Sequence, residues 1–231
     1  MKTIALITAA GKGQRMQNQT PKQYLPLGGR PILARTIKVF EQCSAVDEIY
    51  VIVPAEQMEM VEREIVDKYE FKKVLKVVRG GKLRQQSVWN GLKAIRSECS
   101  IVVIHDGVRP FVTPKMIEQS IKAAAETGAA VVAVPSKDTV KRAAKGKKVQ
   151  TLPREEIWLA QTPQAFQFAL LMKAYQKANQ DEITGTDDAF LVEQMGHPIT
   201  LIEGNYTNIK ITTPEDLAFA ETLLPKDKWD S

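Results

Sequence analysis

The first loop of the chain, residues 9–16, could bind an anion; its sequence is Ala-Ala-Gly-Lys-Gly-Gln-Arg-Met. The alanines and glycines leave the backbone bare, so several N–H groups can turn toward one anion. Arg15 and, shortly after the loop, Lys22 add two permanent cations. This combination suits a triphosphate, whose charge must be held and then redistributed. A strand-to-helix turn without a ligand is the alternative for the loop taken alone.

The two most familiar phosphate-binding loops are absent from the chain. The P-loop pattern, Gly, four residues, Gly-Lys and then Ser or Thr, does not occur. The dinucleotide fingerprint needs three glycines, and only Gly11 and Gly13 fit it because Met16 occupies the third place. The loop therefore predicts an anion site of another type.

The elements that must position this loop alternate between strand and helix. Apolar runs predict buried strands, and apolar residues at spacings of three and four predict helices. We expect strands at 4–7, 49–53, 74–78, 101–104 and 129–134, and helices at 31–43, 55–69, 84–96 and 114–127. This alternation is typical of an α/β fold with a mostly parallel, twisted sheet covered on both faces.

Polar or glycine-rich strings follow three of the expected strands, at residues 9–15, 80–84 and 105–109. Ligands of parallel sheets bind beyond the carboxyl ends of the strands. We therefore expect the three strings to converge on one binding site, although they are far apart in the sequence.

Residues 136–156 interrupt the alternation. They are basic and contain two short β-branched pieces around Gly146, which predicts a hairpin arm that protrudes from a single domain of residues 1–231. Pairing with a second copy would cover the exposed edges of this arm. Beyond it we expect residues 158–160 to re-enter the core, helices at 168–179, at 187–195 with Thr186 as cap, and from Pro214, and strands at 199–203 and 209–211.

Length and composition indicate a globular protein that buries one large core. The chain has 231 residues, of which 44% are hydrophobic and 26% charged, and its apolar runs are too short to span a bilayer. Cys43 and Cys99 lack metal-ligand spacing, which favours reduced thiols in the cytoplasm. The net charge is +5, but the basic arm lacks aromatic side chains that would stack on bases. We expect neither a membrane nor a nucleic acid as partner.

Together these strings resemble those of the 2-C-methyl-D-erythritol 4-phosphate cytidylyltransferases, enzymes of the non-mevalonate isoprenoid pathway. The matching strings lie at residues 9–16, 21–24, 105–110, 137–139, 161–164, 186–189 and 208–212, and at Gly80, Gly81, Arg84 and Ser87. The resemblance implies a Rossmann-like nucleotidyltransferase domain. It also implies that a phosphate oxygen of a small polyol phosphate attacks the α-phosphorus of CTP and that pyrophosphate leaves.

The resemblance assigns roles to several of the matching residues. Arg15 and Lys22 would be the catalytic cations at the α-phosphate. Asp106 would lie near Mg²⁺, or another divalent cation, and near the substrate; the alternative is an aspartate that bonds its own loop. The CTP-binding positions would be Ala9, Ala10, Gly11, Gly13, Gly81 and Ser87, although Ser87 could be an ordinary helix serine.

The acceptor would be bound by Asp106, Arg109, Thr139, Arg154, Thr186 and Lys210. For Lys210 the alternative is a strand lysine on a solvated face. Thr139 and Arg154 belong to the arm, which in the family reaches the partner's site, so the resemblance implies a homodimer. Lys82 departs from the family, whose members often carry an acidic pair at this position. We expect its side chain to point to solvent or to add a long-range attraction for CTP.

Three rival functions remain open at this stage. Ribitol-5-phosphate cytidylyltransferase is a sister family with the same loops and chemistry. A nucleotide-binding regulator with a silent site is a second alternative, which the presence of Arg15, Lys22, Asp106 and Lys210 disfavours. A nucleic-acid-binding module depends only on the basic arm and the net charge.

Overall fold

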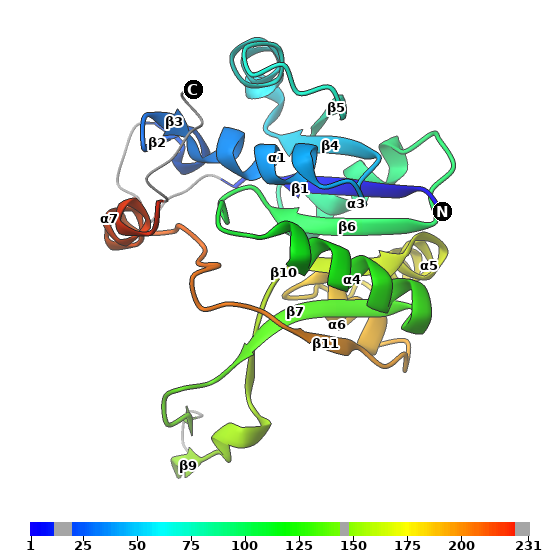
Figure 1. Cartoon of the computed structure of the whole chain (residues 1–231). Coiled ribbons are helices and arrows are strands. Elements are labelled where there is room, and N and C mark those ends of the chain that lie inside the picture. Colours follow the sequence, from blue (N-terminus) through cyan, green and yellow to red (C-terminus); the bar gives the residue numbers. More distant parts are fainter. Residues whose placement is uncertain (12–19, 144–147, 225–231) are drawn as a thin grey trace.

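The computed structural model describes residues 1–11, 20–143 and 148–224. Within these ranges a seven-stranded sheet forms the centre of the molecule, in the order β11-β7-β10-β6-β1-β4-β5 (Figure 1). The strands are β1 (Thr3–Thr8), β4 (Glu48–Val53), β5 (Val74–Arg79), β6 (Ile101–Asp106), β7 (Ala129–Pro135), β10 (Trp158–Gln167) and β11 (Thr200–Glu203). All pairings are parallel except those of β10, which runs antiparallel between β6 and β7. The predicted mostly parallel sheet is confirmed.

Helices cover both faces of the sheet because the central strand is apolar on both sides. Ala5 and Ile7 of β1 pack in one cluster with α1 (Ile32–Gln42) and α4 (Pro114–Thr127). Ile4 and Leu6 point to the other face. There they pack in a cluster with α3 (Arg84–Ala94), α5 (Phe168–Gln180) and α6 (Asp188–Glu193). The apolar runs and the helical stripes of the sequence thus meet as expected.

Several helix ends lie where the sequence predicts them. Thr113 caps α4 with its Oγ1, which accepts a hydrogen bond from the Met116 N–H at 3.3 Å, and Gly128 ends the helix at φ +94°. Thr213 caps α7 (Pro214–Leu223) in the same way. The predicted cap of α6 is wrong: Asp187 accepts from the Phe190 N–H at 2.9 Å, one residue after Thr186.

The structure corrects three other expectations. Residues 55–69 form three helical turns of different type rather than one α-helix: η3 (Ala55–Gln57), α2 (Met58–Val61) and the π-helix η4 (Glu62–Asp67). Residues 209–211 form no strand among the described residues, although the Ile211 N–H bonds to the Val108 carbonyl. Trp158 and Leu159 do not re-enter the core; they begin β10, where it pairs only with β7, and are 39% and 51% exposed.

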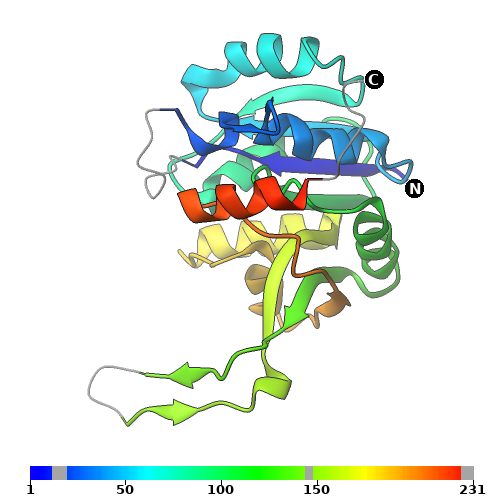
Figure 2. The same cartoon turned by 60° about the vertical axis from the view of Figure 1, so that its left-hand side comes forward.

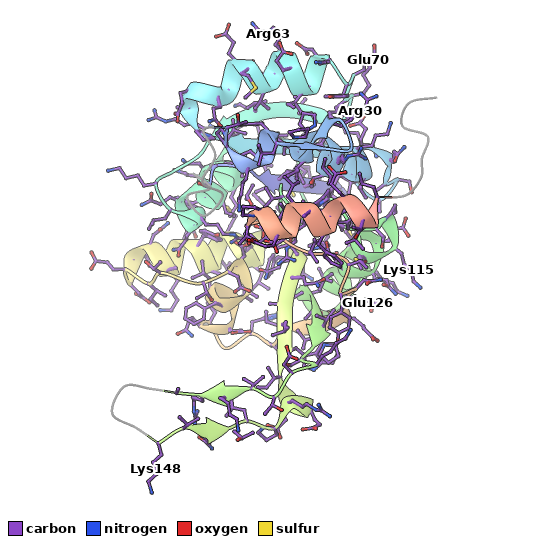
Figure 3. All side chains as sticks on the ribbon, turned by 90° about the vertical axis from the view of Figure 1, so that its left-hand side faces the viewer. Arg30, Arg63, Glu70, Lys115, Glu126 and Lys148 are labelled. Carbon is purple, nitrogen blue, oxygen red and sulfur yellow. The ribbon has the colours of Figure 1, made fainter. Side chains whose placement is uncertain are left out.

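The basic segment forms the predicted hairpin. Its strands β8 (Lys141–Arg142) and β9 (Gln150–Thr151) pair antiparallel, and the turn η5 (Arg154–Glu156) leads back to β10. The hairpin stands away from the rest of the molecule (Figure 2). Lys148 extends from it into solvent (Figure 3). No helix of the described residues is long and apolar enough to cross a membrane.

Candidate active site

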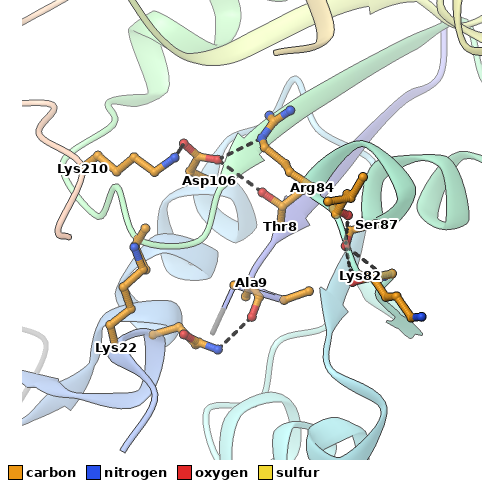
Figure 4. A pocket seen from close by; sticks show the side chains of 14 residues that line it. Thr8, Ala9, Lys22, Lys82, Arg84, Ser87, Asp106 and Lys210 are labelled. Atoms are coloured by element: carbon orange, nitrogen blue, oxygen red, sulfur yellow. Dashed lines mark hydrogen bonds and ion pairs between the residues drawn. The ribbon is translucent and has the colours of Figure 1, made fainter. Parts of the chain in front are cut away.

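A pocket of about 480 Å³ lies where the first loop leaves β1, beside the ends of β5 and β6 (Figure 4). The predicted convergence of three strings is confirmed for the described residues, because all three contribute to the pocket wall. The lining residues are Thr8, Ala9, Ala10, Gly11, Lys22, Gln23, Gly81, Lys82, Leu83, Arg84, Ser87, Asp106, Val108 and Lys210.

The backbone at the start of the first loop is held from two sides. The Ala9 N–H donates to the Ile52 carbonyl at 2.7 Å, so it extends the sheet and is not available to an anion. Ala10 packs so closely on Gly80 that a Cβ there would lie 2.5 Å from the Ala10 Cβ. By contrast, a Cβ on Gly11 would meet no atom within 4 Å. The bare backbone that faces the pocket therefore begins at Ala10 and Gly11.

Lys22 reaches the pocket from a short turn, η2 (Lys22–Tyr24), next to β2 (Pro26–Leu27) and β3 (Arg30–Pro31). The adjacent Gln23 is buried, and its Nε2 donates to the Ala9 carbonyl at 2.9 Å. This bond ties the lysine to the first loop. In Figure 4, Lys22 and Lys82 lie on opposite sides of the pocket.

Ser87 holds the second loop rather than pointing an unused hydroxyl at a ligand. Its Oγ accepts from the Gly81 N–H at 2.9 Å and donates to the Leu83 carbonyl at 3.0 Å. Gln86 binds the same loop, since its Oε1 accepts from the Lys82 N–H at 3.0 Å. The Lys82 ammonium points away from Asp106 (Figure 4), as expected for a lysine that is mostly in solvent.

Asp106, at the end of β6, is the centre of the charged groups in the pocket. Its Oδ2 lies 2.8 Å from Lys210 Nζ and 3.6 Å from Arg109 Nε, and its Oδ1 lies 3.6 Å from Arg84 Nε. Burial alone raises the pKa of this carboxyl, but the three cations outweigh burial and hold the pKa well below its usual range. Asp106 is therefore an ionised carboxylate, and it pairs with cations instead of bonding only its own loop.

Arg84 connects Asp106 to a second carboxylate outside the pocket. Its Nη2 lies 2.7 Å from Oδ2 of Asp188, which is completely buried. The Tyr175 hydroxyl donates to Oδ1 of the same carboxylate at 2.5 Å. Sequence reasoning gave neither Arg84 nor Asp188 a role. The sequence does contain an indication for Asp188. It stands directly before an apolar helical run, where a carboxylate is buried and therefore needs a charged partner.

His105 fixes the backbone that carries Asp106. Its Nε2 lies 3.1 Å from the Arg109 carbonyl, which can only accept, so Nε2 carries the proton. Nδ1 then accepts from the Thr162 hydroxyl at 3.0 Å, and that oxygen accepts from the Asp106 N–H at 3.1 Å. The imidazole is completely buried, and burial lowers its pKa to about 4. It is therefore a neutral structural histidine.

Asn208 positions Arg109 and the chain segment that carries Lys210. Its Nδ2 donates to Gln161 Oε1 and to the Thr162 carbonyl, both at 2.9 Å, and its own carbonyl accepts from Arg109 Nη1 at 2.7 Å. The chain is thereby anchored to β10 two residues before Lys210. This anchoring gives Lys210 a partner in the pocket, so it is not a lysine on a solvated sheet face.

The remaining predicted site residues lie elsewhere. Among the described residues, Arg109 pairs with Asp106 but is outside the pocket lining, and Thr139, Arg154 and Thr186 are exposed and also outside it. Thr139 and Arg154 lie at the base of the hairpin, and Thr186 precedes α6. Gly13 and Arg15 lie outside the described residues.

A mostly parallel sheet with a cationic, backbone-lined pocket at its strand ends is typical of a Rossmann-like nucleotide-binding protein. The family model described as 2-C-methyl-D-erythritol 4-phosphate cytidylyltransferase matches residues 3–226. The chain belongs to this family.

Known relatives of this family match along nearly the whole chain. A 2-C-methyl-D-erythritol 4-phosphate cytidylyltransferase of Alkaliphilus oremlandii is 48% identical over 224 residues, which cover 96% of this chain and 95% of that protein. The crystal structure of 4-diphosphocytidyl-2C-methyl-D-erythritol synthase from Anaerococcus prevotii has a TM-score of 0.85 at 34% identity and covers 96% of this chain and 95% of that one. The corresponding cytidylyltransferase structure from Francisella tularensis has a TM-score of 0.82 at 32% identity, with coverage of 97% and 100%.

The buried histidine makes a testable prediction about pH. An unfolded histidine titrates near pH ~6.5, whereas His105 in the folded chain titrates at about 4. Between these two pKa values only the unfolded chain takes up the proton. The free energy of unfolding is therefore highest above the unfolded pKa and falls by about 3 kcal/mol as the pH drops to the folded pKa of His105. Urea unfolding from pH 7 to 4 measures this loss, and imidazole NMR signals follow the titration directly.

The chain's only other histidine, His197, supplies the matched control. His197→Asn should keep the pH slope, and His105→Asn should lose this part of it. An NMR titration of His105 near pH ~6.5 would contradict the burial argument.

Proposed function

We propose that the protein transfers a cytidylyl group from CTP to 2-C-methyl-D-erythritol 4-phosphate. The products would be 4-diphosphocytidyl-2-C-methyl-D-erythritol and pyrophosphate. One observation carries the proposal: family strings that are far apart in the sequence line a single cationic pocket. This pocket offers bare backbone on one side and, on another, the Asp106 carboxylate with Arg84 and Lys210. Arg109 pairs with the same carboxylate from behind the pocket lining.

Catalysis would depend on positioning and on charge rather than on a covalent intermediate. A phosphate oxygen of the acceptor forms a bond to the α-phosphorus of CTP while the bond to pyrophosphate breaks. The backbone at Ala10 and Gly11 would hold the nucleotide, and Gly81, whose N–H is bonded to Ser87, would line its site. Lys22 would stabilise the charge that builds up on the α-phosphoryl oxygens, and we assign the same role to Arg15 from its place in the family string.

The acceptor phosphate would bind on the side of Asp106, where Lys210 and Arg109 supply positive charge. Thr186 would contribute from the loop before α6. Ser87 would act on CTP indirectly, because its hydroxyl already holds the Gly81 N–H.

A divalent cation fits this site only as an ion that arrives with the nucleotide. The described residues contain no group of three His, Cys, Asp or Glu side chains that could hold a metal. Asp106 would supply one oxygen ligand, and phosphate oxygens and water would supply the others, which is the usual environment of Mg²⁺. When bound, the ion would neutralise charge on the phosphates.

The arm supports a homodimer. We propose a cytoplasmic location from the free thiols of Cys43 and Cys99. Thr139 and Arg154 are exposed on the arm, outside the pocket of their own chain. Leu159, at the start of β10 where the arm ends, is an exposed apolar side chain. We propose that two copies pair through residues 136–156 and that each arm brings Thr139 and Arg154 to the partner's pocket. Pairing would also cover the open edges of the hairpin.

Pyrophosphate release tests the activity itself. With CTP, Mg²⁺ and 2-C-methyl-D-erythritol 4-phosphate we expect turnover, and we expect chelation with EDTA to abolish it reversibly. Ribitol 5-phosphate is the matched control acceptor and should give far slower release. Release with ribitol 5-phosphate alone would assign the protein to the sister activity, and no release with either acceptor would indicate a silent site.

Subunit complementation tests the action of the arm in the partner's site. Lys22→Ala and Arg154→Ala should each inactivate a homodimer. A heterodimer of the two variants, purified through two different tags, contains one complete pocket if Arg154 acts in trans, so it should regain about half of the wild-type activity. An inactive heterodimer would mean that Arg154 acts within its own chain.

A further inference from the structure

The geometry points to Asp188 as a positioning residue of the active site. It lies outside the pocket, completely buried, yet it binds Arg84, which lines the pocket and faces Asp106. We propose that Asp188, held by Tyr175, fixes the Arg84 guanidinium so that its Nε edge keeps the Asp106 carboxylate in place. The inference rests on the proposed function for its assay.

The guanidinium of Arg84 contacts two carboxylates, one outside the pocket and one in its lining. Nη2 makes the closer contact, 2.7 Å to Asp188, and Nε lies 3.6 Å from Asp106. Because a guanidinium is planar and rigid, fixing one edge also sets the direction of the other. The closer contact, to the fully buried Asp188, therefore sets the orientation of the guanidinium, and its contact with Asp106 in the pocket follows from it.

Asp188 is itself held from several elements. The Tyr175 hydroxyl donates to it at 2.5 Å, and the Tyr175 ring stacks on Trp89 of α3 with centroids 5.8 Å apart. Gln85, next to Arg84, donates to the Ile183 carbonyl at 3.0 Å and accepts from the Gly185 N–H at 2.9 Å. These bonds fasten the loop before α6 onto the start of α3, so Arg84 and Asp188 have little freedom to separate.

The charges explain why this support matters to the reaction. Three cations, Arg84, Arg109 and Lys210, face two carboxylates, Asp106 and Asp188, which leaves one positive charge in excess. Lys210 is the nearest partner of Asp106 and has a long, flexible side chain. If Lys210 turns to a substrate phosphate, a fixed Arg84 still holds the carboxylate.

A double-mutant cycle tests whether Asp188 acts through Arg84. Arg84→Lys keeps the charge but loses the rigid fork, and Asp188→Asn removes the anion that orients it. We expect each to lower kcat by about tenfold, and the double variant to be no slower than the slower single variant, since both remove one arrangement. If the two losses multiply, Asp188 does not act through Arg84 and the proposal is wrong.

Nucleotide affinity separates positioning from a general loosening of the fold. Asp188→Asn removes a negative charge close to the pocket, so CTP should bind as tightly as before, or more tightly, while kcat falls. Weaker CTP binding with the same kcat would overturn the proposal. Asp181→Asn is the matched control, because Asp181 pairs with Lys177 on the surface, and it should change neither quantity.

Two further measurements keep the test independent of folding and of the assay. Tyr175→Phe removes one hydroxyl from a buried site and should lower kcat less than Asp188→Asn, again with CTP affinity retained. In NMR spectra, the Nε–H signal of Arg84, identified by its loss in Arg84→Lys, should shift or broaden in Asp188→Asn but not in Asp181→Asn. An unchanged signal would contradict the proposal even if the wild-type enzyme proved inactive on the proposed acceptor.

Discussion

The site depends on the ion pairs of one buried carboxylate, that of Asp106. A buried charge is costly unless partners compensate it, and here three cations do so from three separate segments. Arg84 comes from the start of α3, Arg109 from the turn after β6, and Lys210 from the irregular chain before α7. Because all three cations must reach the same carboxylate, Asp106 fixes the segment of Lys210 against those of Arg84 and Arg109, which lie more than 100 residues earlier in the sequence.

The antiparallel strand β10 supplies the support behind these charges. Thr162 accepts from the Asp106 N–H and donates to His105, and Asn208 bonds both Gln161 and Thr162. The same strand therefore orients the carboxylate and anchors the segment that carries Lys210. These supporting groups are neutral, buried and hydrogen-bonded to one another, so they hold the charged side chains at fixed positions.

Much of the fold could be predicted from the sequence because apolar runs and helical stripes report burial directly. The strings after β1, β5 and β6 predicted the pocket, since parallel strands bring their ends together. The strand predictions that were wrong or missing concern segments whose structure depends on contacts with distant parts of the chain. Residues 161–167 gave no clear strand signal because polar Gln and Thr are buried there by bonds to Asn208 and Asp187. Residues 209–211 look like a strand but are fixed by Val108 and Arg109 instead. The ion pairs that link Asp188 through Arg84 to Asp106 likewise cannot be predicted from the sequence, because the three residues are brought together only by the fold.

The most direct test of this account is turnover and CTP binding in Asp106→Asn. The substitution keeps the shape of the side chain and removes the one anion that the three cations share. Turnover should fall on the order of 100-fold because the three cations lose the carboxylate that orients them. CTP measured without Mg²⁺, as a free anion, should bind at least as well as to the wild type. Thermal unfolding would verify that the variant is folded. Wild-type turnover in a folded Asp106→Asn protein would contradict the account.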